Sequence, residues 1–195
     1  MSKSLAGASG FFATAGILAG AFPPPAAAID APAYTAAAEQ SRLEFVGVQA
    51  GADFKGVFHK FSVAFEFAPD ALAASRLDVQ IDMSSVDSMD KDRDKTMKGP
   101  DVFDVAHAPT AHYAATRFTK TAAGYAAVGA LTLHGVTKDV PIDFQFNQGP
   151  GGATLKGSAK LKRLDFGVGQ GDWKSTEWIG DAVNINFSLV LTPKA

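Results

Sequence analysis

The side chains that could carry out acid–base or metal chemistry are few and far apart. The four histidines are His59, His107, His112 and His134. His107 and His112 are five residues apart, whereas two zinc ligands on one helix face are four apart. The sequence contains no Gly-x-Ser-x-Gly motif, and no pair of carboxyl groups lies in apolar sequence that would tune their pKa values. We therefore predict that the protein is not an enzyme and holds no metal ion.

One acidic stretch has part of the spacing of a calcium-binding loop. Asp90, Asp92 and Asp94 occupy positions 1, 3 and 5 of such a loop, and Asp101 occupies position 12. Position 6 is Lys95, however, where the sharp turn of the loop requires glycine, and position 12 is normally a bidentate glutamate. Basic residues are interleaved with these acids: Lys91, Arg93, Lys95 and Lys98. Ion pairs on a solvent-exposed helix are therefore the simpler interpretation.

Composition excludes several classes of protein. The length of 195 residues is typical of one domain. The 18 Lys and Arg residues against 20 Asp and Glu give no basic surplus, so we predict no nucleic-acid partner. Without cysteine, disulfides and thiolate metal sites are excluded. The glycines of residues 167–171 lack the spacing of a dinucleotide fingerprint, and no cofactor is predicted. The 15 phenylalanines favour a strongly apolar interior.

The beginning of the chain has the layout of a secretory signal peptide. Lys3 provides a positive start, residues 11–22 are an apolar run, and Ala26–Ala28 form an A-x-A cleavage site. Because this run is shorter than the roughly 20 apolar residues that span a bilayer, a membrane anchor is disfavoured. We predict a cleaved signal peptide over residues 1–28 and an exported domain over residues 29–195 that is not an integral membrane protein.

Apolar and polar residues alternate along most of the remaining chain, which predicts strands with one buried face. The clearest alternation covers six segments: residues 43–47, 61–67, 77–83, 125–133, 140–146 and 183–191. Residues 110–118 and 153–164 alternate less strictly and bring the expected total to roughly eight strands. Hairpin turns are expected at His134-Gly135 and at residues 149–152, and such short links favour antiparallel pairing.

Three segments fall outside this pattern. Residues 31–38 are mostly alanine, and we expect them to form a leader into the first strand. Residues 87–104 are charged and do not alternate, so a short helix and a loop are expected there, lying over one end of the sheet. Residues 165–178 are also irregular and contain both tryptophans, Trp173 and Trp178.

An antiparallel sheet with one apolar face buries that face in a sandwich or in a closed barrel. The interior of an eight-stranded barrel is either filled by side chains or holds one small ligand. Five positions expected to face inward are small: Gly47, Ala127, Gly129, Gly157 and Ala159. We interpret them as a sign of open space, although small residues also accommodate the taper of a filled barrel.

Five motifs resemble, in the same order, those of the YceI-like family of exported bacterial polyisoprenoid-binding proteins. Leu131–Val140 (LTLHGVTKDV) is similar to the family signature of a strand, His-Gly-Val-Thr-Lys and a second strand. The other motifs are Tyr34-Thr35 with Ser41 and Phe45; Gly56, Phe58 and Phe61 with Phe67 and Pro69; Arg93 with Val102–Val105 and Pro109-Thr110; and Leu164–Gly169 with Gly180–Val183. Val102, Ala108 and Ala36 depart from the usual family residues, which indicates a diverged branch.

The resemblance implies an all-β fold: an extended eight-stranded antiparallel lipocalin-like barrel with a short helical and loop insertion. It also implies a periplasmic binding protein or carrier whose partner is a long-chain amphiphile, such as a polyisoprenoid, an isoprenoid quinone or a fatty amide. Each buried methylene contributes roughly 0.8 kcal/mol, so such a cavity would select tails by length and width. Family members are often dimers, so a homodimer is one expected state.

The expected ligand-binding residues are apolar side chains at inward positions: Phe45, Phe58, Phe65, Met83, Leu131, Leu133, Phe144, Phe166 and Phe187. Phe103, Trp173 and Trp178 lie on irregular segments and are expected at the mouth, where an indole N–H could reach a polar head. Two alternatives stay open. A barrel filled by its own side chains would be a stress or interaction module without ligand. A lipid-modifying enzyme would need an ionisable group inside the barrel, and these positions offer none.

Overall fold

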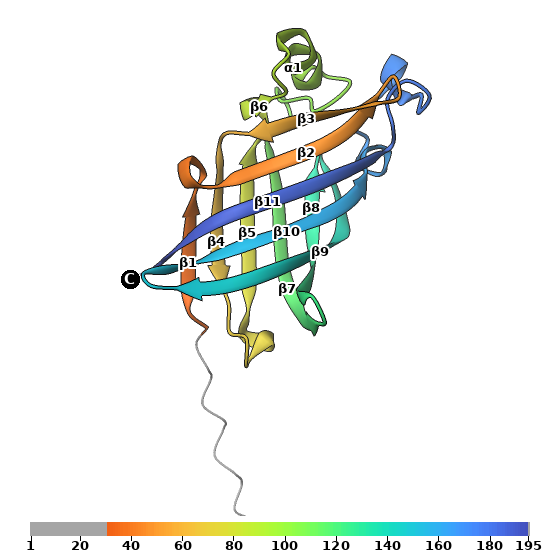
Figure 1. Cartoon of the computed structure of the whole chain (residues 1–195). Helices are drawn as coiled ribbons and strands as arrows, with labels where there is room; N and C mark the ends of the chain where they lie inside the picture. Colours follow the sequence, from red (N-terminus) through yellow and green to blue (C-terminus); the bar gives the residue numbers. More distant parts are fainter. Residues whose placement is uncertain (1–30, 195) are drawn as a thin grey trace, which may run out of the picture.

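The computed structural model describes residues 31–194, and the signal peptide predicted over residues 1–28 lies outside this range. The described chain consists mostly of strands and contains one α-helix, α1 (Lys91–Lys98). The strands form one antiparallel sheet that closes into a barrel (Figure 1). Among the described residues, no helix has the length and apolar character needed to cross a bilayer.

The barrel wall has eight strands, of which five are continuous and three are interrupted. The continuous strands are β7 (Thr110–Thr121), β8 (Gly124–Leu133), β9 (Val136–Gly149), β10 (Gly152–Lys162) and β11 (Ala182–Pro193). The interrupted strands are β1 (Ala33–Ala37) with β2 (Arg42–Gln49), β3 (Ala52–Phe58) with β4 (Phe61–Glu66), and β5 (Arg76–Asp82) with β6 (Val86–Asp87). Each strand pairs with its neighbours in chain order, and both β1 and β2 pair with β11 to close the barrel. The predicted eight-stranded antiparallel barrel is confirmed.

Serine side chains replace backbone hydrogen bonds where the strands are interrupted. Between β1 and β2, a 3₁₀ turn (Ala38–Gln40) precedes Ser41, whose Oγ accepts the N–H of Val190 at 3.1 Å. Between β5 and β6, Ser85 Oγ accepts the N–H of Lys60 at 3.0 Å. These hydroxyls accept strand N–H groups at the interruptions, so the wall bends while its hydrogen bonding continues.

The structure corrects two expectations about the first part of the barrel. Residues 31–38 are not a leader: β1 pairs with both β4 and β11, and Tyr34 of β1 is buried. Alanines lie on both faces of β1 around Tyr34, so the sequence there shows no alternation of apolar and polar residues. The alternation of residues did not indicate strand β3, because Gly56 interrupts its apolar face and a buried Val57 follows at once; the family resemblance had placed Gly56 and Phe58 in a hairpin.

The predicted hairpin turns are present. His134 and Gly135 join β8 to β9 with φ values of 53° and 76°, and Gly151, in the turn between β9 and β10, has a φ of 82°. Two successive residues with positive φ give a turn whose twist matches that of the flanking strands. Histidine is among the side chains that tolerate this conformation better than most.

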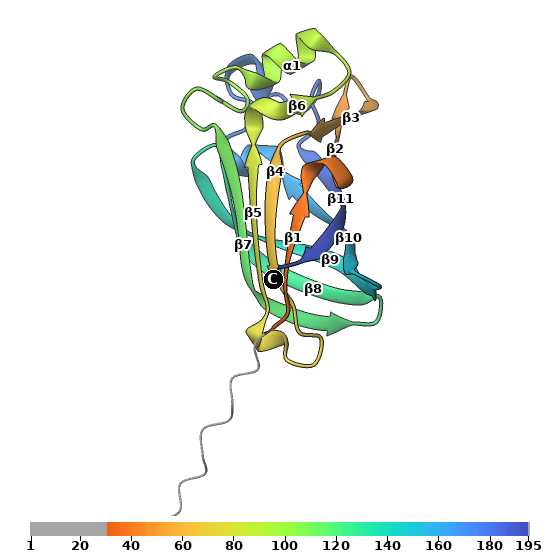
Figure 2. The same cartoon turned by 90° about the vertical axis from the view of Figure 1, so that its left-hand side faces the viewer.

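Helix α1 and the loop of residues 163–181 cover the same end of the barrel (Figure 2). Asp90 is the N-cap residue of α1. Its carboxylate accepts the N–H groups of Asp92 and Arg93 at 3.1 and 3.0 Å. Just beyond the helix, the carbonyl of Asp101 accepts the N–H of Gln170 at 2.6 Å, which joins the two covering segments. The helix and loop expected over residues 87–104 are therefore found over one end of the sheet.

Candidate functional site

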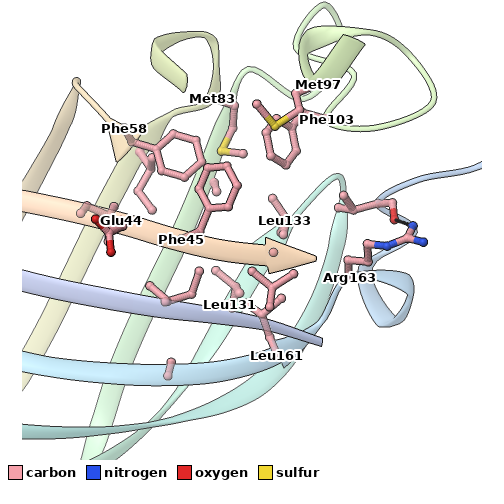
Figure 3. Close-up of a pocket in the computed structure, with 18 of the residues that line it drawn as sticks. Glu44, Phe45, Phe58, Met83, Met97, Phe103, Leu131, Leu133, Leu161 and Arg163 are labelled. Atoms are coloured by element: carbon pink, nitrogen blue, oxygen red, sulfur yellow. Dashed lines mark hydrogen bonds between the residues drawn. The ribbon is translucent and has the colours of Figure 1, made fainter. Parts of the chain in front are cut away.

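The barrel is hollow at the end covered by α1. Inward side chains of the barrel, together with α1 and the loop of residues 163–181, enclose a cavity of about 470 Å³ (Figure 3). This volume lies within the range of roughly 300–1,000 Å³ that is usual for pockets that bind small molecules. The wall is predominantly apolar, and it includes residues from β2 to β5, from β7 to β11 and from α1.

Eight of the predicted ligand-binding residues lie in the cavity wall: Phe45, Phe58, Met83, Phe103, Leu131, Leu133, Trp173 and Phe187. Most of them come from strands whose alternation directed these side chains inward. Phe103 and Trp173 come from the two irregular segments, and both contribute to the end of the cavity next to α1. The sequence thus predicted eight of the residues that line this cavity.

The other four predicted residues lie elsewhere. Phe65, Phe144 and Phe166 are buried, with exposed fractions of 1–3%, but they pack into the core outside the cavity wall. Trp178 is 57% exposed on the outer surface. Ligand contact by these four residues stays a prediction, but the cavity, as it stands, does not reach them.

Sequence analysis also left out several residues of the cavity wall. Phe61, Val79, Ile81, Val183 and Ile185 all line the cavity, and the same two-residue period places them on the inner face. Another omission is Met97, which is buried although α1 is otherwise highly charged. One apolar residue in a charged helix is the signal that could have indicated this contact.

A group of aromatic rings forms one side of the cavity. The rings of Phe45 and Phe58 have centroids 5.6 Å apart, and Phe58 lies 6.2 Å from Phe103 (Figure 3). The ring of Phe45 also lies against Gly56 of the neighbouring strand, at a distance that a Cβ atom on residue 56 would not permit. Gly56 is thus required by the close approach of the Phe45 ring, which covers the backbone of β3.

Two of the five small inward residues border the open space: Gly47 and Ala159 line the cavity, whereas Ala127, Gly129 and Gly157 do not. Ring atoms of neighbouring residues lie where Cβ atoms would project from three of these glycines, at 2.9 Å for Phe54 over Gly47, 2.6 Å for Tyr113 over Gly129 and 2.5 Å for Phe187 over Gly157. The open space expected beside small residues is therefore present at Gly47 and Ala159, and it is filled by rings at Gly129 and Gly157. All three glycines have a neighbouring ring against the backbone. They allow aromatic side chains to lie flat against the barrel wall.

Arg93 joins α1 to the mouth of the barrel. Its guanidinium carbon lies 4.6 Å from the centroid of the Phe54 ring, and its Nε donates a hydrogen bond to Gln49 Oε1 at 3.1 Å. A carboxylate oxygen of Asp90 lies 3.6 Å from its Nη2. The backbone N–H of Arg93 in turn helps to hold the pKa of Asp90 below its usual value. The guanidinium of Arg93 is thus held by the Phe54 ring, Gln49 and Asp90.

Arg163 is buried and holds the loop of residues 163–181. Its guanidinium donates to five backbone carbonyls: Val168, Gly169, Ser175, Ile179 and Gly180. Burial lowers the pKa of Arg163, and Asp181 acts in the opposite direction. In Figure 3 the guanidinium points away from the apolar wall and towards this loop. Its hydrogen bonds therefore shape the covering loop.

Tyr113 and three of the four histidines also have hydrogen-bond partners. Tyr113 lines the cavity and donates its hydroxyl to the carbonyl of Val140 at 3.0 Å, and burial raises the pKa of this phenol. Three histidines pair with carboxylates: His59 with Asp87, His107 with Asp104 and His112 with Asp78. Within residues 31–194, no three His, Asp or Glu side chains form a group that could hold a metal ion. The cavity is suited to enclosing an apolar molecule.

The chain resembles proteins of known sequence and structure over most of its length. The family model for the YceI-like domain matches residues 34–191. A UPF0312 protein of Vibrio cholerae is 36% identical over 121 residues, and a UPF0312 protein of Yersinia pestis is 34% identical over 119 residues. Each match covers 58% of this chain, and they cover 64% and 62% of the length of those relatives, respectively.

Solved structures have the same architecture. The crystal structure of BcnA from Burkholderia cenocepacia is 31% identical, with a TM-score of 0.76, and the match covers 80% of this chain and 98% of BcnA. A polyisoprenoid-binding domain from Saccharophagus degradans has a TM-score of 0.63 over 84% of this chain and 99% of that domain. Its 18% identity shows a shared fold. Because the family model matches the chain from the first strand of the barrel to the last, the chain belongs to the YceI-like family.

Proposed function

We propose that this chain is a binding protein or carrier that encloses the apolar tail of a long-chain amphiphile in the hollow half of its barrel. The observation that supports this function is the apolar cavity of about 470 Å³ inside a closed wall. Apolar surface gains free energy when it leaves water, roughly 0.8 kcal/mol for each methylene. Affinity can therefore be built from the tail alone, without a catalytic group.

The mouth of the cavity favours an uncharged polar head. The cationic side chains among the described residues of the wall are Arg93 and Arg163, and both are engaged by protein groups. Asp92 contributes negative charge at the same end, where Asp90 is paired with Arg93. A diphosphate head would therefore meet carboxylates without a free guanidinium to pair with. Among the expected amphiphiles, an isoprenoid quinone or a fatty amide, whose head is uncharged, therefore fits this mouth better than a polyisoprenoid that carries a charged head.

Resemblance to other proteins supports a tail of the isoprenoid class. The Saccharophagus degradans structure is described as a polyisoprenoid-binding domain, and it shares the fold. We propose, from the predicted signal peptide over residues 1–28, that the protein is exported and acts in the periplasm. Immunodetection in the periplasmic fraction of the host, together with the mass of the mature chain, tests this location.

The function is tested by mass spectrometry of an organic extract of the protein purified from its native host. We expect one amphiphile in a stoichiometric amount. The purified lipid should then raise the Tm of the emptied protein, because a ligand that binds only the folded state stabilises it by RT ln(1 + [L]/Kd). An empty extract, with a Tm that long-chain lipids do not change, would support an interaction module without ligand instead.

A further inference from the structure

The inside of the barrel is divided into a hollow half and a filled half. On β4, Phe61 and Val63 line the cavity, whereas Phe65, the next residue on the same face, does not. On β9, Ile142 lines the cavity and Phe144, two residues further on, does not. Since successive inward residues of a strand are two apart, the cavity ends between Val63 and Phe65 on β4 and between Ile142 and Phe144 on β9. On the neighbouring strands it reaches Leu77 and Leu155, which pair with Phe65 and Phe146.

The filled half contains a cluster of aromatic rings, which we call the aromatic plug. Its members come from β4 and the residue after it, β7, β8 and β9: Phe65, Phe67, Phe118, Tyr125, Phe144 and Phe146. Phe65 stacks on Phe67 with centroids 5.0 Å apart, and Phe67 lies 5.7 Å from Phe144. The plug thus crosses the interior from one side of the barrel to the other.

The aromatic plug is closely packed. Phe65, Phe67 and Phe144 have exposed fractions of 1%, 0% and 3%. The centroid of Phe67 lies 4.8 Å from that of Phe146 and 4.9 Å from that of Tyr125. Rings packed at the density of a protein interior leave no passage for a chain of methylenes. Along β4 and β9, a tail that enters from the α1 end must stop or turn back at Phe65 and Phe144.

We propose that the aromatic plug sets the longest tail that the cavity accepts, with Phe65 and Phe144 as the residues that determine this length. This inference rests on the proposed function, because it concerns the ligand of the same cavity. Each additional methylene should increase affinity about fourfold while apolar space remains. Beyond the length at which the tail meets Phe65 and Phe144, affinity should stop rising.

The test is a series of unbranched primary alcohols from octanol to eicosanol, which carry an uncharged head. Each alcohol competes with a fluorescent naphthalene dye for the full mature chain, and its Kd is plotted against tail length. We expect a steep rise in affinity followed by a break. Phe65→Ala and Phe144→Ala each remove a ring from the cavity end of the plug, so in each variant the break should move to longer alcohols.

Two further kinds of variant make the test specific. Leu191→Ala is the control, because Leu191 is a fully buried side chain that belongs neither to the cavity wall nor to the plug, and its break should stay where it is in the unmodified protein. Ile142→Phe adds a ring above the plug, and its break should move to shorter alcohols. If an alanine variant does not fold, Phe65→Leu replaces it, with the same direction of shift expected.

The outcomes separate this inference from the proposed function. If neither the alcohols nor the dye bind the unmodified protein, the proposed carrier function is contradicted. If the alcohols bind but their affinity rises without a break, the carrier function stands and the length limit is wrong. A break that stays at the same length in the Phe65, Phe144 and Ile142 variants would show that the aromatic plug does not set it.

Discussion

The guanidinium carbon of Arg93 lies 4.6 Å from the centre of the Phe54 ring, so that a charge on α1 rests on an aromatic side chain of β3. The same guanidinium donates to Gln49 on β2. One side chain therefore joins the helix that covers the cavity to two strands of the mouth. Arg93 and Phe54 both line the cavity, so this contact fixes α1 beside the cavity wall.

Replacing Arg93 should loosen this closure. A cation–π contact at an exposed site contributes about 0.5–1 kcal/mol. We expect Arg93→Ala to release a bound amphiphile about two- to fivefold faster, as measured by stopped-flow displacement of a fluorescent ligand. Arg93→Lys keeps the charge but lacks the planar fork that reaches Gln49, so its release rate should be intermediate. Equal rates in all three proteins would contradict a role of Arg93 in holding α1 over the mouth.

Arg163 should be required for the stability of the covering loop. Its removal leaves five backbone carbonyls without their donor, and a buried polar group without a partner costs about 1–3 kcal/mol. We expect Arg163→Met to lower the free energy of unfolding by about 3 kcal/mol in urea titrations. Arg163→Lys offers fewer donors and should recover only part of this loss. An unchanged urea midpoint in Arg163→Met would show that water replaces the guanidinium at no cost.

The contact between Gly56 and Phe45 predicts a coupled pair of substitutions. Gly56→Ala would place a methyl group in the ring of Phe45, and overpacking of this kind costs about 1–3 kcal/mol. In Phe45→Ala the ring is absent, so adding Gly56→Ala to it should cost much less. Denaturant titrations of the four proteins of this double-mutant cycle measure the difference.

Gly149 supplies the control for this cycle. A Cβ atom at Gly149 would have no neighbour within 4 Å, and its backbone is not in the left-handed region. Gly149→Ala should therefore change stability by less than about 0.5 kcal/mol. Equal costs of Gly56→Ala with and without the Phe45 ring would contradict the proposed contact.

Asp90 should make α1 sensitive to acid. The N–H groups of Arg93 and Asp92 lower its pKa in the folded protein. A carboxyl group whose pKa is lower in the folded state stabilises that state above its unfolded pKa of about 3.9, and this contribution is lost as the pH falls through the lower folded pKa. Asp90→Asn keeps a side chain that caps a helix but does not titrate. We expect the Tm of the unmodified protein to fall towards, or below, that of Asp90→Asn between neutral and strongly acidic pH.

A constant difference in Tm between these two proteins over that pH range would contradict the role of the Asp90 charge. Asp90→Ala serves as the control, since it removes the cap at every pH. Its Tm should be lower than that of Asp90→Asn throughout the range.

The alternation of residues predicted the strands and their buried faces, but it left a sandwich and a closed barrel open, and the family resemblance indicated the barrel. Side chains such as Val79, Leu131 and Ile185 must face the interior, because a strand presents every second residue to one side. Strand β7 alternates less clearly, since a bulge between Ala115 and Arg117 shifts its register and brings both Ala115 and Phe118 to the buried side. Such a bulge is decided by pairing with β8 and leaves no reliable mark in the local sequence.

What the sequence by itself determined is which residues face inward; the tertiary structure decided which of them meet. Phe45 and Phe65 have the same type and the same alternation, yet Phe45 lines the cavity and Phe65 belongs to the aromatic plug. The difference arises from the level at which each residue lies along the barrel. At the level of Phe65, rings from β7 and β9 cross the interior, and at the level of Phe45 space is left beneath α1. Levels depend on the register of strands far apart in the chain, which local alternation does not encode.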